Sequence, residues 1–224
     1  MAKPSRLPAN YETNVFINCP FDETYVPIFD AIVFSVHDAG FRPLSARARM
    51  NSGEVRLGKL VELIRMSRYS IHDLSRTESD DRSLPRFNMP LELGIVIGCM
   101  NFGTIRHQRK SMLVLDRERY RYQSFVSDIA GQDIADHRDV PEAAVEKVRN
   151  WLRTESDDAR IPGPEFIVER YHRFRSELPA FASVAKLNAK SLTFVDYSYL
   201  IAEWLKENSH RPARRAPRTQ SLPK

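Results

Sequence analysis

Two carboxylates, Asp73 and Glu92, have places in the chain that suit chemistry on a bound ligand. Asp73 ends a short apolar run, RYSIHD, that is typical of a strand, and Glu92 follows a polar loop in the helical stretch NMPLELGIVIG. In an open parallel sheet, this order of strand, loop and helix places both side chains at the carboxyl edge, where such folds bind ligands. Carboxylates at that edge could stabilise a cationic transition state, as in glycosidic bond cleavage.

The surroundings of Glu92 favour a role in catalysis over a role in helix capping. Asn88 is the expected N-cap and Pro90 suits the first turn, so Glu92 would lie in the opening turn of its helix. The helix dipole alone would favour an acid there by up to ~1 kcal/mol. However, the helix is otherwise apolar, and Gly94 and Gly98 should let its backbone pack closely on the sheet. Burying a charged side chain costs free energy, so we expect a carboxylate at such a position to have a function.

Further polar and basic residues are candidates for binding phosphate or sugar groups at the same edge. They are Arg47, Arg49, Ser52 and Arg56 after the second expected strand, Ser75 and Arg76 after the third, and Arg86 and Asn88 before the helix that carries Glu92. For the residues after the second strand, a solvated loop is an equally good interpretation. Asn88 could be a helix cap, a ligand contact or both.

Several other kinds of site are not indicated. The chain has neither GxGxxG nor GxxxxGK[ST], the phosphate-binding signatures of dinucleotide folds and ATPases. Cys19 and Cys99 are far apart and lack a CxxC or Cys/His cluster, so we expect free thiols and no metal. His72 precedes Asp73 directly and should face the opposite side of the strand, in the core or behind the site.

Strand and helix signals alternate through most of the chain. The expected strands are 13–18, 41–46, a run ending at 72–75, 111–115 and 134–136, and the expected helices are 23–39, 53–68, one opening at 88, and 141–152. This alternation predicts a flavodoxin-like α/β fold, with a parallel sheet of about five strands and helices on both faces. Two amphipathic helices, 164–178 and 192–206, should form a C-terminal helical extension that could pad the sheet, pair with another subunit or form a lobe.

The composition of the chain predicts its domain organisation and its location in the cell. We expect an arm (1–12), the α/β domain (13–155), the helical extension (164–207) and a disordered basic tail (208–224). The net charge is +5, and the tail holds five basic residues and no acid, so the rest is neutral and nucleic acid is expected to bind only weakly, through the tail. No apolar run reaches ~20 residues, and the N-terminus lacks the apolar core of a signal, so we expect a cytoplasmic protein without a membrane partner.

The strings HDLSR and FNMPLELG, separated by a loop, resemble a superfamily pattern. They are similar to DLT followed by NPNVFYELG in the nucleoside 2-deoxyribosyltransferase-like superfamily, which is related to bacterial TIR-like domains. The resemblance covers about residues 14–136, and Leu91 stands where an aromatic residue is usual. It implies that Glu92 attacks or stabilises C1′ of a ribosyl group and that Asp73 holds the leaving base or the sugar. It also implies that Asn18, Pro20 and Phe21 belong to a loop that binds phosphate and sugar.

The resemblance implies a nucleotide N-glycosidase, most plausibly an NAD hydrolase that uses NAD as substrate and needs no cofactor. It also implies a homo-oligomer whose site is completed across a dimer contact and, by analogy, an antiviral-defence effector with other components of such a system as partners. Two alternatives stay open. One is a nucleotide-sensing or oligomerisation module without turnover, and the other is a nucleoside deoxyribosyltransferase.

Overall fold

The computed structural model describes residues 10–48, 51, 53–77 and 87–209. Two expected binding residues, Ser52 and Arg86, lie outside these ranges, as do Arg49, the arm up to residue 9 and the basic tail from residue 210.

Five parallel strands form one sheet in the order β2-β1-β3-β4-β5, which confirms the predicted flavodoxin-like α/β fold. The strands are β1 (Asn14–Asn18), β2 (Arg42–Leu44), β3 (Tyr69–Asp73), β4 (Ser111–Asp116) and β5 (Ala135–Asp136). β1 and β3 are buried throughout, as expected for central strands covered on both faces. In the register of the sheet, Asn18 of β1 pairs with His72 of β3, so both strands end at the same edge.

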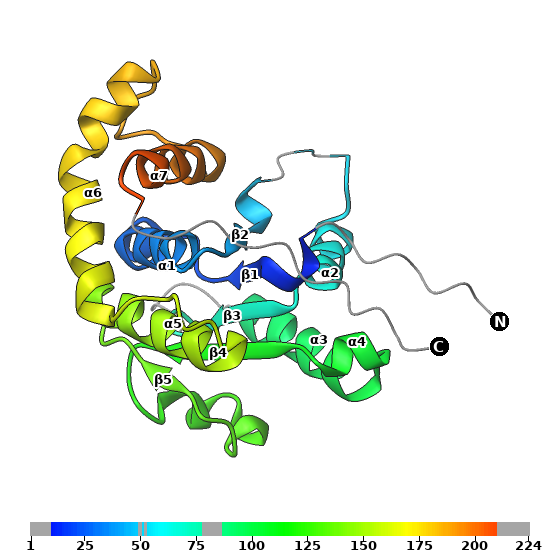
Figure 1. The fold of residues 1–224 in the computed structure, drawn as a ribbon. Coiled ribbons are helices and arrows are strands. Elements are labelled where there is room, and N and C mark those ends of the chain that lie inside the picture. The colour runs from blue at the N-terminus through cyan, green and yellow to red at the C-terminus, as the bar shows by residue number, and fades with distance from the viewer. Residues whose placement is uncertain (1–9, 49–50, 52, 78–86, 210–224) are drawn as a thin grey trace, which may run out of the picture.

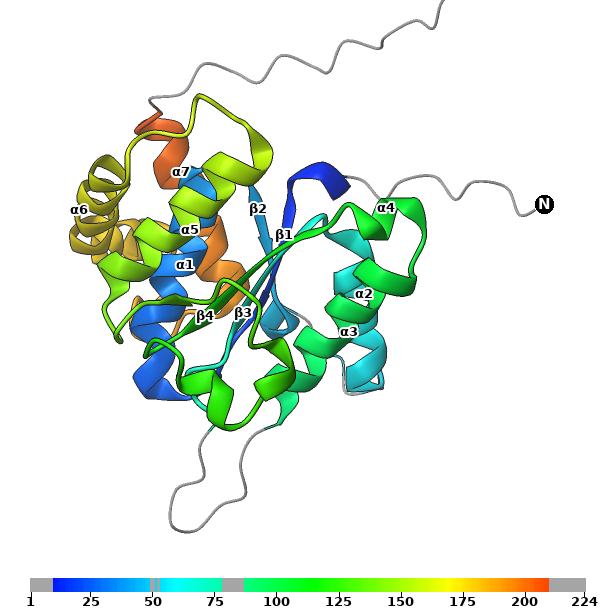
Figure 2. The same ribbon diagram turned by 90° about the horizontal axis from the view of Figure 1, so that it is seen from below.

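Helices cover both faces of the sheet (Figure 1). α2 (Arg56–Met66) and α3 (Asn88–Phe102) lie on one face, followed by the short α4 (Ile105–Gln108). α1 (Val26–Asp38) and α5 (Pro141–Ser156) lie on the other face, as Figure 2 shows along the strands. Short 3-10 turns precede several elements: Tyr11–Thr13, Glu23–Tyr25, Ala46–Ala48, Arg121–Ser124 and Ser127–Ile129.

The C-terminal helices form a third layer. α6 (Pro164–Val184) and α7 (Phe194–Glu207) pack on the outer side of α1 and α5, away from the sheet (Figure 1). Their buried side chains belong to the same hydrophobic cluster as those of the sheet and of α1. Phe34 of α1 shows how closely they join, because its ring contacts the rings of Tyr171, Phe174 and Trp204. The extension therefore pads the α/β domain.

The predicted role of two glycines is wrong. A Cβ atom built at Gly94 or Gly98 would meet no atom within 4 Å, so these residues face open space and not the sheet. The helix is apolar on nearly all sides, and for this reason its hydrophobic pattern does not show which side is buried. Within the described ranges, no helix combines the length and the apolar character that crossing a membrane requires.

Candidate active site

The candidate site lies where β1 and β3 end side by side. In this strand order the chain turns to opposite sides after β1 and β3, and open α/β sheets bind ligands in the crevice at such a point. The Asn18 amide nitrogen donates to the Met89 carbonyl at 3.2 Å and lies 3.1 Å from Nδ1 of His72. Asn18 thus fastens the start of α3 to the sheet edge. It is buried, so its place is in the wall of the site and not in contact with solvent.

The turn after β1 is held by its own polar groups and by Arg47. The Asp22 carboxylate accepts the backbone N–H of Tyr25 at 3.1 Å and so caps the 3-10 turn that leads into α1. Arg47 donates to the Pro20 carbonyl at 3.1 Å. Its guanidinium carbon lies 4.7 Å from the ring centroid of Phe21 and 4.3 Å from that of Phe29, so it is stacked between two aromatic rings.

A hollow of about 330 Å³ opens beside this turn. We call it the basic hollow; among the described residues it is lined by Phe21, Ala46, Arg47, Arg56 and Lys59. Arg56 also stacks over Phe21, at 5.4 Å from the ring centroid. Three cations around one exposed aromatic ring form a surface that suits phosphate groups together with a flat base or a sugar.

Glu92 lies in α3 and is buried. Its side chain is only 4% exposed, and within the described part of the chain no hydrogen bond to its carboxylate is found. Burial raises its pKa to about 7, and the positive charge of Arg56 opposes this rise. Glu92 is not among the residues that line the hollow, but Arg56 is, and its positive charge acts on the Glu92 carboxylate. A buried carboxyl whose pKa is raised by burial is a candidate for a functional group.

The start of α3 differs from the predicted one. The helix begins at Asn88, its N-cap is Phe87, and no side chain caps it. Asn88 is the first residue of the helix itself, so it is not the expected N-cap. Glu92 lies in the second turn and not the first, and the free N–H groups of the helix start therefore do not explain its presence.

Asp73 is enclosed in a hydrogen-bonded cluster. It is 0% exposed. One of its oxygens accepts from the Tyr25 hydroxyl at 2.7 Å and from Nε2 of His137 at 2.9 Å, and the other accepts from the backbone N–H of Ser75 at 2.8 Å. Burial acts to raise its pKa, but these hydrogen bonds and the His137 charge lower it overall. The predicted contact of Asp73 with base or sugar is not what the structure shows; Asp73 ties three loops together.

His137 completes this cluster from the turn after β5. Burial acts to lower its pKa, but the hydrogen bond and the charge of Asp73 raise it overall. When the ring is neutral, with its proton on Nε2, its Nδ1 accepts the backbone N–H of Asp139 at 3.0 Å. His72 is also buried, and burial lowers its pKa to about 3, so it is a neutral core residue as expected.

The remaining expected residues lie around the same edge but apart from Glu92. Ser75 is fully buried, and its hydroxyl has no hydrogen-bond partner among the described residues. Arg76 is half-buried; it pairs with Asp139 at 3.3 Å and lies 3.9 Å from Asp22, so it spans the loops after β1, β3 and β5. The structure therefore brings Phe21 and Arg47 to the basic hollow, with Pro20 bonded to Arg47 beside it, and puts Ser75 and Arg76 with the Asp73 cluster.

Three residues at this edge were not identified from the sequence. Lys59 follows Arg56 by three residues on α2, and this helical spacing could have revealed it. Tyr25 and His137 carry no local signal, because they join Asp73 across 48 and 64 residues of chain. Among the described residues no cluster of three or more His, Cys, Asp or Glu side chains could hold a metal ion.

Replacing Glu92 with glutamine should stabilise the protein at alkaline pH. The pKa of Glu92 is raised from 4.5 to about 7 on folding, so the folded state keeps a proton that the unfolded state releases. Ionised Glu92 therefore destabilises the fold as pH rises from 4.5 through 7. Glu92→Gln should gain about 2–3 kcal/mol at pH 8 and much less at pH 5, a rise in Tm of roughly 5–10 °C at pH 8.

Thermal unfolding of both proteins at the two pH values measures this difference. Glu62→Gln is the control, since Glu62 is an exposed acid already paired with Arg65 and its replacement should not stabilise the fold at either pH. A gain at pH 8 that is no larger than at pH 5 would mean that Glu92 has an ordinary pKa in the folded protein.

No protein-family model, curated protein or solved structure matches the chain.

Proposed function

We propose that the protein is an N-glycosidase of nucleotides, with NAD as its most plausible substrate. The observation that carries the proposal is Glu92: a buried carboxyl with no hydrogen bond from the described residues and a pKa of about 7, next to a basic hollow at the ligand-binding edge of the sheet. The resemblance of HDLSR and FNMPLELG to the deoxyribosyltransferase-like superfamily supports the same reaction.

The basic hollow would bind the phosphates. Arg47 and Arg56 present guanidinium groups, which match phosphate oxygens in pairs, and Lys59 adds a third positive charge. Phe21, about 41% exposed, offers a flat face for a ring. A substrate with two phosphates between two nucleosides would in this way be held with one ribose toward α3.

Glu92 would act at C1′ of that ribose. The bond from C1′ to the nicotinamide nitrogen breaks, the electron pair leaves with the neutral base, and the ribose carries the positive charge of an oxocarbenium ion. The ionised Glu92 stabilises this charge or attacks C1′, and water then adds to give ADP-ribose and a proton. Asp73 has a positioning role, since its cluster fixes the loops that flank the site.

Nicotinamide release from NAD tests the function. The wild-type protein should release nicotinamide at a rate that rises with pH through about 7, as Glu92 ionises. Glu92→Gln keeps the size of the side chain but not the charge, and it should lower the rate at least about 100-fold. Glu62→Gln is the matched control and should leave the rate unchanged. Equal release by wild type and Glu92→Gln would exclude the assignment.

A nucleotide-sensing module without turnover is the second candidate. It is favoured by one observation: the basic hollow is lined by cations and an aromatic ring, and Glu92 is not in its lining. Such a module would bind NAD with the same affinity in wild type and Glu92→Gln and release no nicotinamide. A deoxyribosyltransferase would instead form an exchanged nucleoside when a second nucleobase is supplied, so the same assay separates all three.

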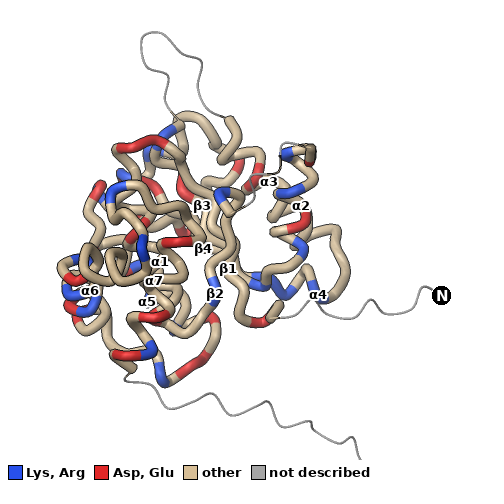
Figure 3. Tube along the Cα trace, turned by 90° about the horizontal axis from the view of Figure 1, so that it is seen from above, with Lys and Arg blue, Asp and Glu red and all other residues tan. Residues whose placement is uncertain are grey.

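We also propose that α3 and α4 form the contact of a homodimer. Four exposed apolar side chains and the two glycines lie along this surface: Phe87, Leu91, Gly94, Gly98, Phe102 and Ile105. On α3 they fall on one side of the helix, at spacings of three and four residues. The tube along α3 is uncharged except at Glu92 (Figure 3). A helix surface that is apolar and uncharged is unusual on a monomer.

A second copy of this chain suits the surface better than a charged partner does. Gly94 and Gly98 form a shallow centre with larger side chains at both ends, so two such helices related by a two-fold axis can approach closely without repulsion between charges. The four large side chains expose on the order of 600 Å², near the ~800 Å² per partner of a stable interface. Partners from a defence system, which the resemblance implies, stay a prediction.

Replacing Leu91 with glutamate should therefore prevent dimer formation. A charge at position 91 would be buried without a partner against apolar side chains of the second copy, which costs several kcal/mol of association free energy. Light scattering after size-exclusion chromatography should give a dimer for wild type and a monomer for Leu91→Glu. Val184→Glu is the control, because Val184 is 87% exposed at the end of α6 on another side of the molecule. A wild-type monomer at every concentration would contradict the proposal.

A further inference from the structure

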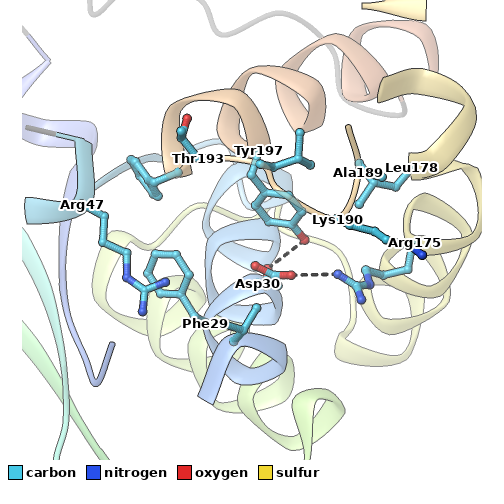
Figure 4. Close-up of a pocket in the computed structure, with 12 residues that line it drawn as sticks. Phe29, Asp30, Arg47, Arg175, Leu178, Ala189, Lys190, Thr193 and Tyr197 are labelled. Atoms are coloured by element: carbon cyan, nitrogen blue, oxygen red, sulfur yellow. Dashed lines mark hydrogen bonds and ion pairs between the residues drawn. The ribbon is translucent and has the colours of Figure 1, made fainter. Parts of the chain in front are cut away.

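A second pocket lies between α1 and the C-terminal helices, and most of its lining residues come from α6, α7 and the loop between them. We call it the α1–α7 pocket; its volume is about 160 Å³. Its polar wall is formed by Asp30, Arg47, Arg175, Lys190 and Tyr197 (Figure 4). It adjoins a wider groove of about 660 Å³, which shares Arg175 and Lys190 with it.

The charges of this pocket favour an anion. Three cations face it, from the 3-10 turn after β2, from α6 and from the loop between α6 and α7, against the single carboxylate of Asp30. In Figure 4, Arg47 is on one side of Asp30 and Arg175 and Lys190 are on the other. Asp30 pairs with Arg175 at 2.8 Å. Lys190 is exposed, and among the described residues no ion pair is found for its ammonium group.

Aromatic rings line the apolar part of the same pocket. The ring centroids of Phe29 and Phe194 lie 5.9 Å apart, and Tyr197 is buried with its hydroxyl directed to the Asp30 carbonyl at 3.4 Å. Such walls take up a flat ring by stacking and contact. The N-terminus of α7 is not what would hold the anion, because Thr193 and Asp196 already form a capping box there.

We propose that the α1–α7 pocket binds an organic anion with one flat ring system, of which a nucleoside monophosphate is the representative. The ring would enter the narrow, aromatic part, and the phosphate would lie between Arg175 and Lys190 at the mouth of the wider groove. The proposal does not depend on the function of Glu92. It gives the C-terminal helices a binding role in addition to their packing role.

Titration calorimetry with AMP tests the proposal, with adenosine as the uncharged comparison. Wild type should bind AMP at concentrations below about 1 mM and bind adenosine at least about tenfold more weakly. Lys190→Glu should weaken AMP binding at least about tenfold, since it reverses a charge at the phosphate. Lys190 is exposed and unpaired in the described chain, so this variant should fold normally, as its Tm will show.

Arg173→Glu is the matched control, because it reverses a charge on the same helix as Arg175 but does not line the pocket. It should leave the affinity for AMP within about twofold of wild type. The basic hollow also offers cations to a phosphate, so each titration is repeated in the Arg56→Glu background, which changes that hollow and leaves the lining of the α1–α7 pocket intact. No binding of AMP in that background, equal binding of adenosine, or an unchanged affinity in Lys190→Glu would each overturn the proposal. Arg47 is not a useful variant here, because it lines both cavities.

Discussion

Replacing Asp38 with alanine should lower the free energy of unfolding by about 3–5 kcal/mol. Asp38 is 2% exposed and Arg170 is 8% exposed. The Arg170 guanidinium donates to Asp38 through Nε and Nη2, at 3.1 and 3.0 Å, and through Nη1 to the Asn208 carbonyl at 2.9 Å. Without Asp38, a buried positive charge remains that only a carbonyl partly satisfies, and this is the costly outcome for a buried ion pair.

Urea unfolding, with an m-value that is unchanged between variants, measures the loss in free energy of unfolding. Glu62→Ala, which breaks the exposed pair with Arg65, is the control and should cost no more than about 1 kcal/mol. The double variant Asp38→Leu with Arg170→Met removes both charges and should recover much of the stability that Asp38→Ala loses. If Asp38→Ala costs no more than Glu62→Ala, the Arg170 pair does not hold α6 to α1.

Replacing Asp73 with alanine should cost a similar amount, about 3–5 kcal/mol, because three donors lose their acceptor inside the protein. The loss should depend on pH. The pKa of Asp73 is lowered by folding, so its contribution is fully present above the ordinary value of 3.8 and disappears as pH falls through its folded-state pKa. The pKa of His137 is raised by folding. The stability that its positive charge contributes is therefore fully present below about pH 6.5 and is lost as pH rises through the folded-state pKa.

Tyr25→Phe is the matched variant within the same cluster. It removes one of the three hydrogen bonds without leaving a charge unpaired, and it should cost only about 1 kcal/mol. Urea unfolding from pH 4 to 8 separates the two cases. An Asp73→Ala protein as stable as Tyr25→Phe would show that the cluster contributes to shape but not to stability.

The alternation of strands and helices was predictable because each strand is a short apolar run and most helices have one apolar side. The orientation of α3 was not predictable for the opposite reason. Its residues are apolar on nearly every side, so Gly94 and Gly98 were wrongly assigned to the sheet-facing side. The long-range partners also escaped detection: nothing near Asp38 indicates Arg170, which is 132 residues away.

The position of the candidate site was predictable from the sequence, but the environments of its residues were not. Asp73 and Glu92 were expected at one edge of the sheet, and both lie there, because parallel strands end together. Their different environments could not be read from the sequence. Burial of Asp73 depends on Tyr25 and His137, and the raised pKa of Glu92 depends on which side of α3 faces inward. Such properties arise from tertiary contacts and not from local spacing.

The enclosure of α1 has a consequence for how the chain folds during synthesis. Phe34 has no exposed surface, but three of the rings that cover it, those of Tyr171, Phe174 and Trp204, are made more than 130 residues later. While the ribosome is still adding the last helices, α1 therefore presents uncovered aromatic surface to its surroundings. Native packing must wait until translation is nearly complete, which makes the nascent chain a natural client for chaperones.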